Sequence, residues 1–225
     1  MKNCNKFYTK LYLMLLLLSG FGSNQKANAQ IVVGELGYSP VGVFSNDIGF
    51  NKNVITLGAN IINGSHKMVG LTLDYSSNKF EDEDYIYRLS GPSKVAKLTY
   101  NTSLIRLNYT RYFFLVGELD VPFQCFLTGG YSLGFETRGA SLNNKDDFTE
   151  SEISSFKSDY YGLTNQSFVH MQIILGAAVQ YNFTRNIGLR AELNYGTGFS
   201  NTEEILSASY FPKFSLCYKP DYIFR

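Results

Sequence analysis

The sequence predicts an all-β fold, an antiparallel up-and-down β-barrel of eight strands, and three observations carry this prediction. Apolar and polar residues alternate with a period of two through most of the chain. Several alternating segments run well past the ~5–6 residues that are usual for strands in soluble sheets. Long and short connections between the segments alternate along the chain. Because successive side chains of a strand point to opposite faces, each segment has one apolar and one polar face.

A targeting segment precedes the alternating part of the chain. Three lysines within the first ten residues come before the apolar run 11–18, and the small residues Ala27-Asn28-Ala29 follow it. This order describes a secretory signal peptide that is cut after Ala29. The apolar run is shorter than the ~20 residues that a spanning helix needs. We therefore expect residues 1–29 to be a cleaved signal peptide and residues 30–225 to form one barrel domain.

Eight alternating segments follow the signal peptide. Asn63-Gly64, which is typical of a tight hairpin turn, joins the second segment to the third. The sixth and seventh segments alternate most cleanly and flank the short turn Thr184 to Asn186. In chain order, the segments span residues 31–39, 53–62, 68–77, 101–115, 123–136, 167–183, 187–199 and 214–224.

Two long polar stretches separate neighbouring segments. Residues 78–100 contain the acidic run Glu81 to Asp84 and the pair Gly91-Pro92, which is typical of loops. Residues 138–166 are rich in Asn, Asp, Ser and Lys. We expect long loops over both stretches.

The lengths of the connections predict how the barrel is placed. In an up-and-down barrel, alternate connections emerge at opposite ends, so the short ones gather at one end and the long ones at the other. Transmembrane barrels of the bacterial outer membrane have this asymmetry, with short periplasmic turns, long external loops and an even number of strands. With the N-terminus at the periplasmic end, every long connection would lie outside the cell.

The polar face of the segments indicates which side lines the lumen. A soluble barrel would turn its apolar face inward, and alternation alone does not exclude that arrangement. The polar face, however, carries charged residues that could not fill a dry apolar core but could pair in a polar lumen. These are Glu35, Arg106, Glu136, Arg190 and Glu192.

Aromatic residues on the apolar face support the same placement. They gather near the segment ends, where a transmembrane barrel has girdles of amphipathic rings at the lipid headgroups. The expected lipid-facing girdle consists of Tyr75, Phe113, Phe123, Phe135, Tyr181, Phe183, Phe199, Tyr222 and Phe224. The sequence therefore predicts an integral protein of the Gram-negative outer membrane that is exported through the secretory pathway.

Four stretches carry a resemblance to a known family. They are Tyr112-Phe113, Pro122-Phe123 with Gly129-Gly130-Tyr131, residues 176–183 (GAAVQYNF) and residues 189–196 (LRAELNYG). With them the chain resembles the small Gram-negative outer-membrane β-barrels labelled PorT-like or porin-family, whose architecture is that of OmpA/OmpX-type eight-stranded barrels. These patterns belong to a fold and not to a catalytic site. One departure is Arg225, which follows Phe224 where such barrels commonly end on an aromatic residue.

The composition excludes several function classes. A formal net charge of +1 gives no basic patch for nucleic acid. The sequence has no nucleotide-binding loop, zinc-ligand spacing or nucleophile elbow, so we expect no cofactor and no metal. Cys125 and Cys217 fall on opposite faces of their segments, which argues against a structural disulfide.

Three functional hypotheses follow. The first is a structural or interaction protein of the cell envelope, not an enzyme, with a lumen filled by side chains. Besides outer-membrane lipid, its partner would be an extracellular or envelope protein or glycan that binds loops 78–100 and 138–166. The second is a porin-like channel for small solutes or ions. The third is a lipid-modifying enzyme that uses His170, which lies on the polar face.

Overall fold

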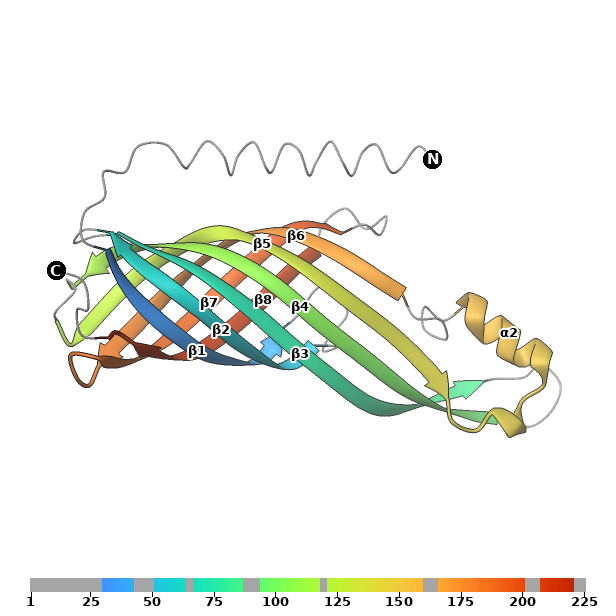
Figure 1. Cartoon of the computed structure of the whole chain (residues 1–225). Coiled ribbons are helices and arrows are strands. Elements are labelled where there is room, and N and C mark those ends of the chain that lie inside the picture. The colour runs from blue at the N-terminus through green and yellow to red at the C-terminus, as the bar shows by residue number, and fades with distance from the viewer. Residues whose placement is uncertain are drawn as a thin grey trace.

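Eight antiparallel strands close into one barrel in which every strand pairs with its neighbour in sequence and β1 pairs back to β8 (Figure 1). The predicted all-β, eight-stranded fold is therefore confirmed. The computed structural model describes residues 30–42, 51–63, 67–86, 94–117, 121–159, 166–200 and 207–220. The predicted signal peptide, residues 1–29, and the girdle positions Tyr222 and Phe224 lie outside the described residues.

The strands are long and their registers leave few gaps. The β3–β4 ladder runs without a break from the pair Lys67–Phe113 to the pair Ile86–Lys94. In order, the strands are β1 (Gln30–Gly42), β2 (Asn51–Asn63), β3 (Lys67–Ile86), β4 (Lys94–Val116), β5 (Phe123–Leu142), β6 (Gln166–Asn182), β7 (Ile187–Ser200) and β8 (Ser207–Tyr218).

The connections define two ends of the barrel. The strand ends that flank residues 64–66, 117–122 and 183–186 share what we call the short-turn end, and the other strand ends share the loop end. At the short-turn end, Gly117 has a φ of 87°, which a side chain would disfavour, and the ladder between β4 and β5 is irregular at Phe114 and Val116. No helix in the described part of the chain is long and apolar enough to cross a membrane.

The barrel has an apolar outer wall and a polar interior. Leu57 and Leu175 on the outer wall are 65% and 61% exposed, whereas Arg106 and Arg190 in the lumen are 2% and 1% exposed. This arrangement is the inverse of a soluble barrel and matches the one predicted from the charged residues on the polar face. A wall of exposed apolar side chains is stable when lipid surrounds it.

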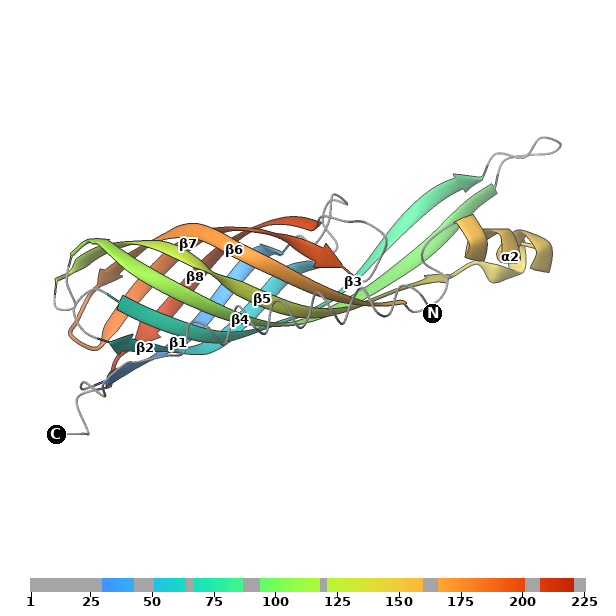
Figure 2. The ribbon, with the colours of Figure 1, turned by 90° about the horizontal axis from the view of Figure 1, so that it is seen from above.

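The prediction of long loops at 78–100 and 138–166 was wrong over much of both stretches. Strands β3, β4 and β5 continue past the barrel rim, and β5 is followed by a 3-10 helix, η1 (Lys145–Asp147), and a helix, α2 (Glu150–Asp159). Figure 2 shows β3 and β4 extending beyond the rim beside α2. Beyond the membrane both faces of a strand meet water, so the apolar alternation fades while the backbone ladder continues. The acidic run from Glu81 to Asp84 is therefore paired strand and not loop.

Two adjacent glycines of β5 allow a direct test of strand packing. A Cβ at Gly130 would lie 1.9 Å from the carbonyl oxygen of Tyr109 in β4, whereas a Cβ at Gly129 would meet only Leu175 and Ile174, no closer than 3.7 Å. We expect Gly130→Ala to lower the free energy of unfolding by about 1–3 kcal/mol, the usual cost of overpacking. Gly129→Ala is the matched control and should leave it unchanged. Urea unfolding followed by circular dichroism measures both, and equal midpoints for the two variants would contradict the account.

Candidate functional site

The lumen is the first candidate site because it concentrates the buried polar residues. Its side chains come from all eight strands and form three ionic clusters above an apolar layer. Four carboxylates face four cationic side chains, so the interior is balanced in charge. The charged residues are Glu35, Asp74, Arg106, Glu136, Arg138, Arg190, Glu192 and Lys213.

The first cluster, which we call the seam cluster, consists of Glu35, Arg190, Glu192 and Lys213. The Arg190 guanidinium forms a salt bridge with Glu35, and its Nε lies 2.8 Å from Glu192 Oε1. Lys213 Nζ lies 2.7 Å from Glu35 Oε1 and 3.3 Å from Glu192 Oε2. Each carboxylate therefore meets both cations, and the four charges cancel.

Neutral side chains complete the hydrogen bonding of the two carboxylates. Asn60 and Ser215 each donate to Glu35 over 2.8 Å. The Tyr112 hydroxyl donates to Glu192 over 3.0 Å, and Asn194 donates to the other oxygen over 3.1 Å. Buried ion pairs are stable when their remaining hydrogen-bonding capacity is filled in this way.

The seam cluster spans the place where the barrel closes. Glu35 lies on β1, Arg190 and Glu192 lie on β7, and Lys213 lies on β8. The β1–β8 ladder runs only from the pair Gly34–Tyr218 to the pair Tyr38–Phe214, which makes it the shortest of the ladders between the described strands. The ionic contacts thus cross-link three strands around the shortest hydrogen-bonded seam.

The second cluster centres on Asp74 and Arg106. Arg106 Nε and Nη2 lie 2.7 and 2.6 Å from Asp74 Oδ2. Asn108 donates to the same oxygen over 2.8 Å, and the Thr56 hydroxyl donates to Oδ1 over 2.6 Å. The Arg106 guanidinium also stacks on Phe211, with its carbon 4.3 Å from the ring centre.

The third cluster places His170 beside Glu136 and Arg138. His170 Nε2 lies 2.9 Å from Glu136 Oε2, and Arg138 Nε donates to the other carboxylate oxygen over 2.7 Å. Phe168 stacks with the His170 ring and lies under the Arg138 guanidinium. His170 is only 3% exposed, so its imidazole is enclosed in the lumen and does not face lipid.

An apolar layer occupies the lumen towards the short-turn end. Tyr112 connects it to the seam cluster, because the Arg190 guanidinium carbon lies 4.7 Å from its ring centre and the same ring packs edge-on against Phe126. The buried members of the layer are Val33, Ile62, Met68, Tyr112, Phe126, Ala178 and Cys217.

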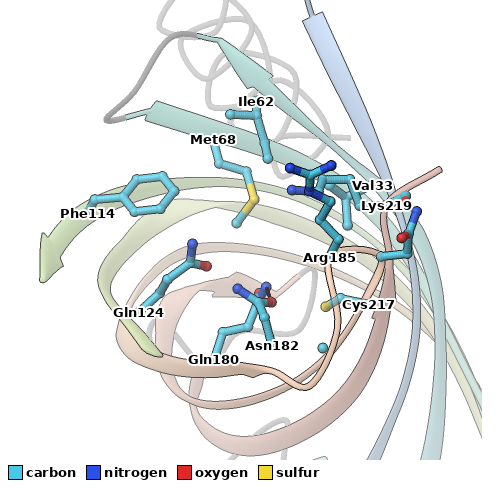
Figure 3. Close-up of a pocket in the computed structure, with 12 residues that line it drawn as sticks. Val33, Ile62, Met68, Phe114, Gln124, Gln180, Asn182, Arg185, Cys217 and Lys219 are labelled. Carbon is cyan, nitrogen blue, oxygen red and sulfur yellow. Dashed lines mark hydrogen bonds between the residues drawn. The ribbon is translucent and has the colours of Figure 1, made fainter. Parts of the chain in front are cut away.

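Two cavities in the described lumen are small. The one at the short-turn mouth, shown in Figure 3, has a volume of about 30 Å³ and lies between the apolar layer and a polar rim that includes Gln124, Gln180 and Arg185. A second, beside Asp74 and Arg106, has a volume of about 10 Å³. Spaces of this size hold about one or two water molecules.

The five charged residues expected in the lumen are all buried, but the structure divides them. Glu35, Arg190 and Glu192 meet in the seam cluster, whereas Arg106 and Glu136 belong to the other two clusters. Sequence reasoning missed Asp74, Arg138 and Lys213, and it placed Arg138 at the start of the expected loop 138–166. Asp74 lies directly opposite Arg106 in the β3–β4 register, so the hairpin pairing would have located it. Lys213 was missed because the last segment was predicted to begin at residue 214, whereas β8 begins at Ser207.

The described girdle positions lie on the outer wall, where each is between 41% and 58% exposed. Tyr181 and Phe183 pack against each other edge to face at a centroid distance of 5.1 Å near the short-turn end. The others are Tyr75, Phe113, Phe123, Phe135 and Phe199.

Metal and disulfide chemistry find no support in the described part of the chain. No group of three or more His, Cys, Asp or Glu side chains is placed there to hold a metal ion. Cys125 and Cys217 are both free thiols, as their opposite faces predicted.

Comparisons with solved structures define the class of protein. The chain is similar to Neisserial surface protein A (NspA), with a TM-score of 0.50 and 14% identity over 87% of this chain and all of that one. It is also similar to a major outer membrane protein from Thermus thermophilus, with a TM-score of 0.51 and 12% identity over 86% of this chain and all of that one. No family model and no curated protein sequence matches. The closed barrel and its exposed apolar wall are those of an eight-stranded β-barrel of the bacterial outer membrane.

Arg190 should be the most sensitive residue of the lumen. Arg190→Met leaves two buried carboxylates facing one cation, and removing one partner of a buried pair typically costs about 3–5 kcal/mol of unfolding free energy. Adding Glu35→Gln restores the charge balance, so the double variant should lose less than Arg190→Met alone. Urea unfolding measures both.

Arg185→Gln is the matched control, because Arg185 is an exposed arginine in the turn between β6 and β7. It should unfold at the wild-type midpoint. If Arg190→Met shares that midpoint, the seam cluster does not stabilise the barrel.

Proposed function

We propose that the protein is a plugged outer-membrane barrel of the interaction type, and not an enzyme, that presents a folded external element to an extracellular or envelope protein or glycan. The observation that carries the proposal is a second apolar core beyond the barrel rim. We use the name projecting element for the outer parts of β3, β4 and β5 together with the two helices. Its parts are residues 79–86, 94–101 and 139–142 with η1 and α2.

The projecting element has its own core, separate from the lumen. Leu98 and Leu142 face each other across the β4–β5 ladder and are 2% and 3% exposed. Ala96 and Phe148 complete the buried group, and Ile153 of α2 packs against it. An apolar core in a segment that lies outside the membrane indicates a folded unit and not a flexible connection.

Side-chain hydrogen bonds fix the start of the helical segment against β4. Asn144 donates to the Val95 carbonyl over 2.9 Å and accepts from the Lys97 backbone N–H over 3.0 Å. Thr149 caps α2, because its backbone N–H donates to Glu152 over 2.8 Å in the manner of a capping box. A surface that is ordered before binding loses less conformational entropy on association.

The element also offers a concave surface. A groove of about 520 Å³ lies between the end of β5 and the first turns of α2. Four of its seven lining residues are polar and exposed and three are apolar, so the groove offers both hydrogen-bonding groups and apolar contact area to a protein segment or a glycan. The lining residues are Ala140, Ser141, Leu142, Lys145, Glu150, Ile153 and Ser154.

The two other hypotheses receive less support. A solute channel needs an open lumen, and the ionic clusters and the apolar layer fill this one. A lipid-modifying enzyme would need His170 within reach of lipid, whereas its Nε2 is engaged with Glu136 inside the barrel.

Membership of the PorT-like family is also part of this proposal, and the four sequence stretches quoted above are its support.

Leu142→Asp should unfold the projecting element without unfolding the barrel. It places a carboxylate in the second core, while the barrel interior is unchanged. Limited proteolysis should then cleave the chain between residues 79 and 159 and leave a barrel that still shifts in gel mobility on heating. The neighbouring Ser141→Asp, on the exposed face of β5, should resist the protease like the wild type. Equal cleavage of the two variants would show that Leu142 does not hold the element together.

The binding role is tested by photo-crosslinking on intact cells. A photoreactive residue at Lys145, which lines the groove, should form adducts with a protein or glycan outside the membrane. The same residue at Arg185, at the other end of the barrel, should not form these adducts. Leu142→Asp should abolish the Lys145 adducts, whereas Lys79→Glu, at an exposed position of the projecting element outside the groove, should preserve them. Adducts that survive the loss of the element's fold would reject the proposed function.

A further inference from the structure

The groove of the projecting element runs along the edge of a strand. Three consecutive residues of β5, Ala140, Ser141 and Leu142, line one side of it. Successive side chains of a strand point to opposite faces of the sheet, so Ser141 lies on the face opposite to Ala140 and Leu142. A groove that meets both faces of one strand follows the edge of that strand, where the backbone is accessible.

The ladders show that this edge of β5 has no strand beside it in the described part of the chain. The β5–β6 ladder stops at the pair Arg138–Gln166, whereas the β4–β5 ladder continues to the pair Leu98–Leu142 (Figure 1). Residues 139–142 of β5 therefore pair with β4 on one side and border the groove on the other. Such a strand edge presents a row of backbone N–H and C=O groups that can pair with another chain.

The register identifies the backbone groups that face the groove. The Asn143 backbone N–H donates to the Lys97 carbonyl of β4 over 2.8 Å. In an antiparallel ladder every second residue of a strand bonds to a given neighbour, so Ser141 turns its backbone groups towards β4 as Asn143 does. Ala140 and Leu142 turn theirs the other way, towards the groove. Each offers one N–H donor and one C=O acceptor, and the two residues lie about 7 Å apart along the strand.

The side chains around the groove define what else an occupant must satisfy. Half-buried Ala140 and Ile153 lie on the side of the second core and offer apolar contact. Ser141 is exposed on the opposite face, where polar side chains meet water. Lys145 and Glu150, which are exposed and of opposite charge, complete the polar lining. The volume of about 520 Å³ is within the range of typical ligand sites.

We infer that the groove binds an extended polypeptide segment, which adds as a strand to the edge of β5 and turns alternate, apolar side chains towards Ala140 and Ile153. In strand addition, main-chain hydrogen bonds supply the affinity and pockets for alternate side chains supply the specificity. A glycan has no backbone of amide donors and carbonyl acceptors at the spacing of a strand. The inference rests on the proposed binding role of the projecting element and narrows its partner to a polypeptide.

The test uses the full mature chain in detergent and a phage-displayed library of linear random peptides. Peptides selected on the wild type should bind Ala140→Pro about tenfold more weakly, because proline removes an N–H that faces the groove and leaves the bonds to β4 in place. Ala140→Ser keeps that N–H and is the matched control, so it should bind like the wild type. Limited proteolysis confirms that the projecting element of each variant is folded before binding is measured.

N-methylated versions of a selected peptide test the same contact without altering the protein. Only every second N–H of an added strand faces β5, so methyl groups on alternate nitrogens should abolish binding in one phase and preserve it in the other. Three results would each overturn the inference: no peptide selected on the wild type, equal binding to the wild type and a folded Ala140→Pro, or methylation effects without a period of two.

Cross-linking on cells separates this inference from the proposed function. Adducts at Lys145 that contain glycan and no polypeptide would overturn the inference and leave the proposed function standing. Adducts that survive the unfolding of the element by Leu142→Asp would reject the proposed function, whatever the peptides show.

Discussion

The salt bridges around Arg190 are the interaction on which the closed barrel depends, because they act where the first and last strands meet. The β1–β8 ladder is short, and lipid outside the barrel gives an open strand edge nothing with which to pair. Arg190 and Lys213 both contact Glu35 of β1 and Glu192 of β7. The charged side chains therefore point into the lumen, where each has a partner of opposite charge. Their salt bridges stabilise the seam between β1 and β8 from inside the barrel.

The same constraint explains how the rest of the lumen is built. Each charged group that the strands turn inward has a partner of opposite sign, and amides and hydroxyls fill the remaining positions on the carboxylates. Tyr112 continues this packing into the apolar layer, because its hydroxyl binds Glu192 while its ring packs against Phe126. Because side chains fill the interior, the surfaces available for recognition lie on the outside of the molecule. One such surface is the projecting element.

The sequence predicted the barrel well because a transmembrane wall imposes a strict period of two. Lipid on one side and a polar lumen on the other leave few exceptions, so the eight strands follow from alternation. The inward placement of Arg190 and Glu192 follows from their charge, which a polar lumen can pair and a dry apolar core cannot. Pairing between strands is harder to predict, because it depends on register. Arg106 was assigned to a common lumenal network, but Asp74, its partner across the hairpin, was found only once the register was known.

The projecting element was not predicted for a related reason. Outside the membrane the chain no longer needs one apolar face. Residues 79–86 therefore form a strand although they lack the alternation of apolar and polar residues that identifies one. The second core there depends on Leu98, Leu142 and Phe148. Leu98 is distant in sequence from Leu142 and Phe148, and neither β4 nor β5 shows a longer apolar run around these positions.

The central claim is that the lumen is closed by its own side chains, and single-channel recording in planar bilayers tests it most directly. The purified barrel, shown to be folded by its gel mobility, should insert without producing stable conductance steps, since buried ionic clusters and an apolar layer occupy the described lumen. Reproducible unitary conductance from the wild-type protein would contradict the account and favour a channel.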